Sequence, residues 1–212
     1  MAKASTRKRK ASERWSLPAT QERSRATRER LLLAAERVFA EKGYDGARLA
    51  DIAEEAGCSV GAVYFRFKDK DALFFAIAES FSEEARLVLP SLIRGLGEAT
   101  PAQIIRNFVF DTAENFKRHR GLFRAIVERG MDHPRAMRAI FVFREELANA
   151  LEKALRGTHG QDASLQVRVM TQMVYGFLLT GILNKAAPTQ IGDERAIAEL
   201  ANACIAYLGA AK

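Results

Sequence analysis

The sequence predicts an all-α protein, and three observations lead to this fold class. Apolar residues recur at intervals of three and four positions from residue 31 onward, which is the period of an amphipathic helix. No strand-like alternation appears after residue 20. Capping residues and glycines divide the chain into segments of helical length. We therefore expect a three-helix N-terminal helix-turn-helix domain, joined by a long fourth helix to a helical C-terminal domain.

The N-terminal part divides into four helices. The first contains Leu31 to Phe39 and ends at Gly43, and the second runs from about Leu49 to Gly57. After the turn, Ser59 caps a short third helix in which Val63 and Phe67 point inward. Asp69 caps the fourth helix, which is expected to end at Pro90.

Further capping residues divide the remainder of the chain. Thr100 to Gln103 combine an N-cap threonine, a proline at the first helical position and a capping-box glutamine. The expected C-terminal helices are 101–118, 121–130, 134–156, 162–186 and 193–209. The expected domains are a disordered basic arm at 1–20, a DNA-binding domain at 21–88 and a ligand-binding and dimerisation domain at 89–212.

The net charge of +7 is concentrated at the N-terminus. Residues 1–30 hold ten basic and three acidic side chains, so the rest of the chain is neutral. This asymmetry favours nucleic acid over an anionic membrane surface as a partner, although a solvated tail fits the same composition. The N-terminus lacks the apolar run of a signal peptide, and Val169 to Leu183 is too short to span a membrane. We expect a cytoplasmic protein with no membrane partner.

Candidate catalytic and metal-binding residues are few. Cys58 and Cys204 lie far apart, and His119, His133 and His159 have no metal-ligand spacing. Phosphate-binding loops and nucleophile elbows are absent from the sequence. We therefore expect no enzyme, no catalytic residue, no metal and no cofactor.

The third helix has an unusual outer side. Small residues there, Gly61 and Ala62, let a partner's backbone approach closely, and Tyr64 and Arg66 can bind phosphates or base edges. Two short helices joined by a three-residue turn are the arrangement that places a second helix in the major groove of DNA. This pattern favours DNA binding, although helical proteins without that function contain similar corners.

Residues Thr27 to Phe74 resemble the N-terminal domain of the TetR family of bacterial repressors. The positions in register include Phe39, Gly43-Tyr44, Asp51-Ile52-Ala53, Ala56-Gly57, Ser59, Gly61, Tyr64, Phe67, Lys70 and Leu73. The resemblance implies phosphate contacts by Tyr64 and Lys70 and base contacts from the outer side of the third helix. Arg48 replaces a common capping Ser or Thr and is expected to be free to reach a phosphate, and Cys58 replaces a valine. The expected DNA-binding residues are Arg48, Ala50, Ser59, Val60, Gly61, Ala62, Tyr64, Phe65, Arg66 and Lys70.

The last two helices are the expected dimer interface. The segment 169–183 is apolar on nearly all sides and contains Gly176 and Gly181, and the final helix carries a stripe of Ile197, Leu200, Ala201, Cys204 and Leu208. They resemble the four-helix dimer bundle of the family, which implies a homodimer through residues 162–209. An intramolecular core is the alternative.

Aromatic and methionine side chains of the C-terminal domain are candidates for a ligand pocket, although such residues are more often plain core. The candidates are Phe108, Phe116, Phe123, Met131, Phe141, Phe143, Met173 and Phe177. They predict an apolar or amphipathic small-molecule ligand.

Together these observations predict a ligand-responsive transcriptional regulator, a repressor, that binds a palindromic double-stranded operator as a homodimer and is released by a small molecule. A non-specific architectural DNA-binding protein is the alternative.

Overall fold

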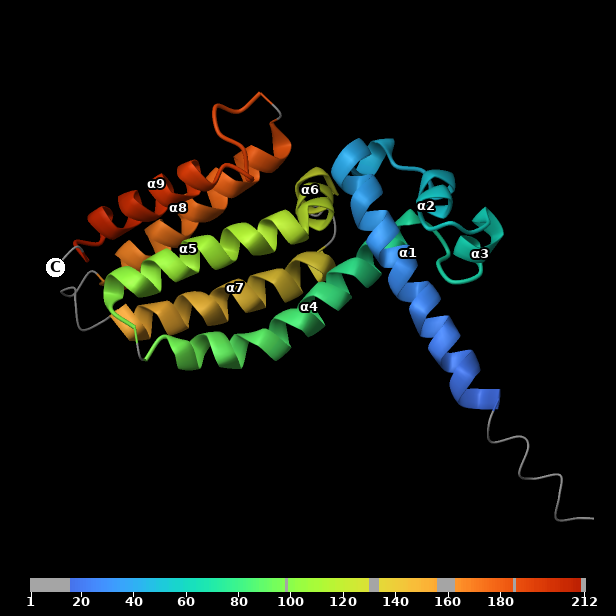
Figure 1. Ribbon diagram of the computed structural model, residues 1–212, viewed down its shortest axis with the longest axis horizontal. Coiled ribbons are helices and arrows are strands. Elements are labelled where there is room, and N and C mark those ends of the chain that lie inside the picture. The colour runs from blue at the N-terminus through green and yellow to red at the C-terminus, as the bar shows by residue number, and fades with distance from the viewer. Residues whose placement is uncertain (1–15, 98, 130–133, 156–162, 185, 211–212) are drawn as a thin grey trace, which may run out of the picture.

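The computed structural model describes residues 16–97, 99–129, 134–155, 163–184 and 186–210, and the regular structure within these ranges is entirely helical (Figure 1). The all-α prediction is confirmed. The helices are α1 (Ser16–Gly46), α2 (Leu49–Glu55), α3 (Val60–Tyr64), α4 (Lys70–Gly95), α5 (Pro101–Arg118), α6 (Arg120–Arg129), α7 (Pro134–Leu155), α8 (Ala163–Leu183) and α9 (Glu194–Tyr207). Within these residues, no helix is both long and apolar enough to cross a membrane.

The helix ends follow the expected local chemistry. The Ser59 hydroxyl accepts the Ala62 N–H, and the Asp69 carboxylate accepts the Ala72 N–H at 2.8 Å. Thr100 and Gln103 form the predicted capping box at the start of α5. These side chains satisfy N–H groups that have no partner within their own helix.

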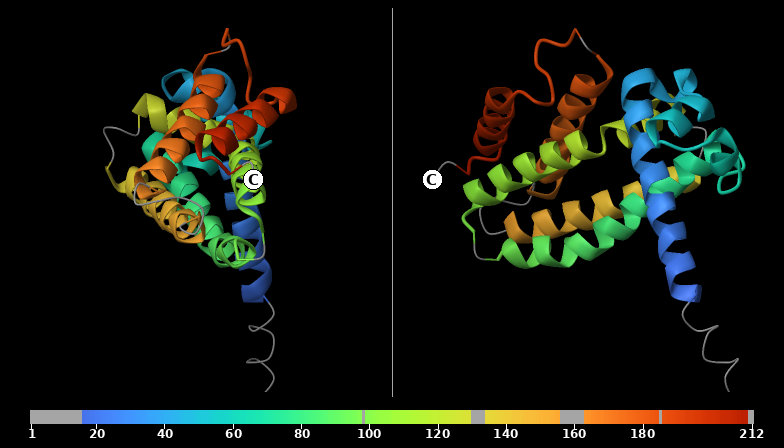
Figure 2. Two further views of the ribbon diagram at one scale, coloured as in Figure 1. Left: turned by 90° about the vertical axis from the view of Figure 1, so that its left-hand side faces the viewer. Right: turned by 45° about the vertical axis from the view of Figure 1, so that its right-hand side comes forward.

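Helix α1 begins earlier than the sequence predicts. Residues 1–15 of the expected arm lie outside the described residues, whereas residues 16–20 are the first turn of α1 rather than disordered chain. Pro18 is compatible with this turn, because the first N–H groups of a helix have no intrahelical acceptor to lose. The N-terminal half of α1 projects away from the body of the molecule in Figures 1 and 2.

Helix α4 passes through Pro90, so the predicted end at this proline is wrong. The helix continues because Leu89 is buried and Leu92 and Leu96, three and seven positions on, face the same side as partly buried residues, while Pro90 faces solvent. Packing of this apolar face outweighs the missing hydrogen bond. Helix α4 therefore belongs to both halves of the chain, and the expected boundary between 88 and 89 cuts a continuous helix.

The C-terminal helices surround a core that continues into the helix-turn-helix part. Helix α4 packs along α7, α5 packs along α9, and α7 packs along α8 (Figures 1 and 2). Helix α6 lies between this bundle and α1, and it packs along α1. Buried residues from both halves form one continuous hydrophobic cluster. The two halves are therefore mechanically joined through α4 and α6.

Candidate nucleic-acid interface and ligand cavity

Helix α3 buries one face and leaves large apolar side chains on the other. Val63 and Phe67 are buried, as predicted, and anchor the helix in the core. Tyr64 is 58% exposed and Phe65 is 84% exposed, and Val60 beside them is also exposed. Burying such side chains is favourable, so their exposure together on a five-residue helix and its C-cap is typical of a surface that binds a partner.

Gly61 lies on this outer surface and has no internal packing role. A Cβ atom placed there would meet only the Ser59 Oγ, at 3.9 Å, which is an ordinary van der Waals distance. Glycine inside a helix costs about 1 kcal/mol relative to alanine. Glycine at this position does not stabilise the fold. The missing side chain instead favours the close approach of another molecule.

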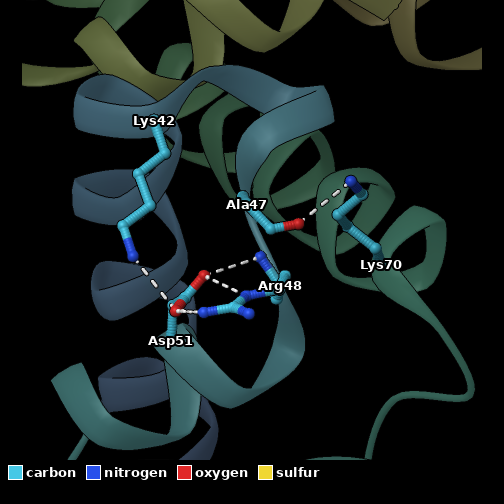
Figure 3. Close-up of polar contacts among 5 residues, drawn as sticks. All are labelled: Lys42, Ala47, Arg48, Asp51 and Lys70. Carbon is cyan, nitrogen blue, oxygen red and sulfur yellow. Dashed lines mark hydrogen bonds and ion pairs between the residues drawn. The ribbon is translucent and has the colours of Figure 1, made fainter.

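Arg48 is bound to its own helix, which differs from the free side chain predicted for it (Figure 3). Its Nε and Nη2 donate to the Asp51 carboxylate at 3.4 and 3.1 Å, and its backbone N–H donates to Asp51 Oδ2 at 3.0 Å. An arginine side chain has no acceptor for the α2 N–H groups. Asp51, the third residue of α2, therefore caps the start of the helix. Arg48 remains an exposed cation that is bound to this carboxylate.

Asp51 also binds Lys42 of α1, at 3.0 Å, so one carboxylate holds two exposed cations (Figure 3). Hydrogen bonds from Arg48 and Lys42 keep the pKa of the Asp51 carboxyl well below its usual range, despite its burial. The carboxylate stays charged at any pH suited to DNA binding, and the cluster keeps one net positive charge.

Lys70 is likewise engaged within the chain (Figure 3). Its Nζ donates to the backbone carbonyls of Tyr44 and Ala47 at 2.6 and 3.0 Å, and it lies 4.4 Å from the centre of the Tyr44 ring. The ammonium thereby fixes the loop between α1 and α2. The phosphate contact implied for Lys70 stays a prediction, and it would require this ammonium to share or exchange its carbonyl partners.

The remaining predicted DNA-binding positions lie on the same side or next to it. Ala50 and Ser59 are exposed, and Ala62 is partly exposed. Arg66 is half-buried, with its guanidinium 5.6 Å from the centre of the Phe65 ring and near the Ala62 carbonyl. The structure thus gathers the predicted residues around α3 and the start of α2.

Helix α6 clamps the C-terminal end of α1. Arg124 Nη1 donates to the α1 carbonyls of Ala40 and Glu41 at 2.9 and 3.2 Å, and its Nε donates to Glu128 at 2.8 Å. The Glu128 carboxylate accepts the Tyr44 N–H. Gly43 is required between them, because its φ of +74° is left-handed and a Cβ would lie 2.6 Å from a Glu128 oxygen.

His119, just before α6, connects three elements. Its Nδ1 lies 3.3 Å from Glu36 of α1, and its Nε2 lies 3.6 Å from Glu84 of α4. The neighbouring Gly121 lets α6 approach α1 closely, since a Cβ there would lie 1.9 Å from the Glu36 carbonyl oxygen. Helices α6 and α1 are therefore in close backbone contact.

The C-terminal helices enclose a cavity of about 790 Å³, within the size range of small-molecule sites. Its walls come from α4, α5, α6, α7 and α8. Five of the predicted pocket residues lie on these walls: Phe108, Phe116, Phe123, Phe141 and Phe143. Contact of these residues with a ligand stays a prediction.

Two other pocket predictions lie elsewhere, and a third is outside the described residues. Met173 lies on the outer face of α8 and is 40% exposed, and Phe177 packs against the core without lining the cavity. Met131 falls outside the described residues. The cavity instead includes Phe81, Arg144 and Tyr175, which were not predicted from the sequence.

The outer face of α8 carries an apolar stripe that no other part of the described chain covers. Leu165, Val169, Met173 and Leu183 are exposed along it, and a Cβ on Gly176 would meet nothing within 4 Å. This α8 stripe has the spacing of a single helix face.

The α9 residues predicted for the dimer interface behave differently. Ile197, Ala201, Cys204 and Leu208 are buried within the chain, and Leu200 is partly buried. Since α9 packs along α5, these side chains are intramolecular core. Gly181 is also internal, because a Cβ there would lie 3.1 Å from the Ile191 nitrogen.

Comparison with known proteins places the helix-turn-helix part in a family. Residues 31–77 match the family described as bacterial regulatory proteins, tetR family. The match lies within the helix-turn-helix part, and over these residues the chain is similar to that family. Similar proteins include the HTH-type transcriptional repressor Rv1474c of Mycobacterium tuberculosis, 44% identical over 63 residues, which are 30% of this chain and 34% of that protein. The HTH-type transcriptional regulator AcrR of Shigella flexneri is 33% identical over 45% of this chain and 44% of its own length.

The curated relatives of this chain are matched over less than half of their length, whereas solved structures match over most of theirs. A transcriptional regulator from Rhodococcus sp. Rha1 has a TM-score of 0.64 at 22% identity, covering 86% of this chain and 94% of that one. The TetR family transcriptional regulator PfmR from Thermus thermophilus has a TM-score of 0.62 at 20% identity, covering 86% and 98%. At this identity the similarity establishes the fold of the C-terminal half.

The residues that join the two halves of this chain were not predicted from the sequence. Arg124 and Glu128 are four residues apart, as in any exposed helical ion pair, so spacing alone gave no sign that they cap α1. Asp51 was a detectable signal, because an acidic residue three positions after an N-cap can accept its N–H.

Proposed function

We propose that this protein is a ligand-responsive transcriptional regulator of the TetR family, acting as a repressor, that binds a palindromic operator as a homodimer and is released by a small molecule. The exposed apolar face of α3 is the observation that carries the DNA-binding part, and Arg48 and Lys42 add exposed cations around the neighbouring helix α2. A five-residue helix with a glycine on its outer side suits close insertion into a major groove.

Dimerisation is proposed through the α8 stripe. Two-fold symmetry would then place two α3 helices in successive major grooves, about 34–36 Å apart as the repeat of B-DNA requires. The palindromic operator follows from this symmetry.

Release is proposed to use the cavity and α6. Phe123 and Ile126 of α6 line the cavity, while Arg124 and Glu128 of the same helix hold the end of α1. A ligand that displaces α6 or α4 would change the separation of the α3 helices. Such a ligand must bind the DNA-free form more tightly than the DNA-bound form.

The test is selection of operator sequences from random duplexes with the full chain, followed by salt titrations on selected and scrambled DNA. We expect a palindromic consensus and selected DNA bound about a thousandfold more tightly than scrambled DNA. Equal binding to both would support the architectural alternative and contradict the proposal.

The basic arm provides an internal comparison for this test. Removing residues 1–15, which leaves α1 whole, should weaken binding to both DNAs. The slope of log affinity against log salt should fall by about 0.9 for each phosphate that the arm neutralises in the intact protein. An unchanged slope would show that the arm is a solvated tail. Loss of operator preference alone would show that the arm reads sequence.

A further inference from the structure

The charges on the cavity wall are mostly paired. Arg118 donates to Glu84 at 2.8 Å, and Glu114 lies 3.3 Å from Lys117, which is outside the cavity lining. Among the charged cavity-lining residues that the structure describes, Asp111 of α5 and Arg144 of α7 have neither an ion pair nor a hydrogen bond from their side chains. The ligand chemistry therefore depends on these two.

Arg144 is a cation built into an aromatic wall. Its guanidinium carbon lies 5.0 Å from the centre of the Phe141 ring and 5.8 Å from that of Tyr175. Contact with two rings positions the guanidinium while leaving its N–H donors unused. A partly buried cation with unmet donors is completed by an anion.

Tyr175 adds a second donor at the same place. Burial raises the pKa of its phenol to about 12, an effect that Arg144 opposes, so the hydroxyl keeps its proton and can donate. In the described part of the chain, no acceptor receives this proton. The Arg144 guanidinium and the Tyr175 phenol are two donors that line the same cavity, and together they suit the two oxygens of a carboxylate.

Asp111 is less suited to direct ligand choice. Asp111 is an exposed residue of α5 that water can solvate. Partial desolvation of its carboxyl raises the pKa of that group. A cation bound there would stay at the rim, whereas Arg144 adjoins the phenylalanine rings that would hold an apolar body.

We propose that the cavity takes an amphipathic organic anion, whose carboxylate binds the guanidinium of Arg144 and the hydroxyl of Tyr175 while its apolar body lies among the phenylalanine rings. This inference deepens the proposed function and rests on it for the ligand's regulatory meaning. Binding itself needs no DNA.

Calorimetry on the full chain without DNA tests this proposal with two matched probe series. The first is dodecanoate, dodecylammonium and dodecanol below their aggregation concentrations, and the second is naphthoate, naphthylmethylammonium and naphthylmethanol. We expect the carboxylate to bind most tightly in at least one series. Arg144→Gln should weaken that carboxylate about tenfold or more and leave the alcohol within about twofold.

Arg138→Gln is the matched control, because Arg138 is an exposed arginine on the same helix that lines a separate groove. It should leave carboxylate binding unchanged. The proposal is overturned if neither carboxylate binds more tightly than its alcohol and ammonium analogues, if Arg144→Gln and Arg138→Gln act alike, or if the ammonium probes bind best and lose affinity in Asp111→Asn.

Operator release by the same probes separates the two proposals. Carboxylate binding through Arg144 without release of operator DNA would contradict the regulatory function but not the ligand chemistry. Normal operator binding with no carboxylate site would contradict the ligand chemistry alone.

Discussion

Gly61 has neither a packing role nor a required backbone conformation within this chain, so an external partner is the remaining reason for it. We predict that Gly61→Ala raises the free energy of unfolding by up to about 1 kcal/mol and weakens operator binding. The stability gain follows from the lower entropy cost of alanine, and the weaker binding follows from the added methyl group at the DNA surface.

Chemical denaturation and operator titration measure the two effects. Gly95→Ala is the matched control, because its Cβ would also meet nothing within 4 Å but lies at the far end of α4. It should not change operator affinity. Unchanged affinity in Gly61→Ala would argue against close approach at this helix.

The positions of side chains were predicted correctly where burial in the core determines them. They were predicted incorrectly where a charged side chain can bind either a residue of the chain or an external partner. Val63 and Phe67 are buried as their spacing indicates. Arg48 differed because a carboxylate three positions away is an intramolecular substitute for a phosphate. Met173 differed because α8 is apolar on nearly all sides, so periodicity could not assign its faces.

At the scale of elements, α6 is the connection that sequence periodicity did not reveal. We predict that Arg124→Met, which keeps the length of the side chain but removes its donors, lowers the free energy of unfolding by about 1–3 kcal/mol. The destabilisation follows from the unpaired carbonyls of Ala40 and Glu41. Denaturation of the DNA-free protein measures it.

The same variant should bind a cavity ligand normally but release operator less completely. Arg106→Met is the control, because that arginine is exposed and makes one hydrogen bond, to Asn202. Equal effects of the two substitutions on stability and release would show that α6 does not clamp α1.

Most helix ends were predictable to within a few residues because caps are local. The starts of α3, α4, α5 and α9 are set by side chains adjacent to them. The start of α1 and the end of α4 were not predictable in this way, because a proline near each one suggested that the helix stops there. Pro18 is tolerated in the first turn of α1, and packing of the apolar face carries α4 past Pro90. Helix packing is a tertiary property, and local residues cannot specify it.

For the whole molecule, the α8 stripe predicts the state of association. Gly176→Arg should raise the dimer dissociation constant by at least about a hundredfold, because the new charge would be buried in the interface without a partner. The monomer has room for the side chain, so its fold should be retained. Sedimentation velocity at micromolar concentration measures the change.

Gly95→Arg serves as the control, since it adds the same charge where a Cβ also meets open space. Gly181→Arg is unsuitable, because it would disturb the chain's own packing against Ile191. A monomeric wild-type protein, or a dimer unaffected by Gly176→Arg, would place the interface elsewhere.

The most direct test of the central claim is the operator affinity of Val60→Glu. Val60 is the first residue of α3, where a carboxylate is favourable to the helix but would face DNA phosphates. We predict that operator affinity falls about a hundredfold or more with unchanged thermal stability, while Val142→Glu, at an exposed valine on α7, leaves affinity unchanged. Wild-type affinity in Val60→Glu would contradict the assignment of α3 as the DNA-binding helix.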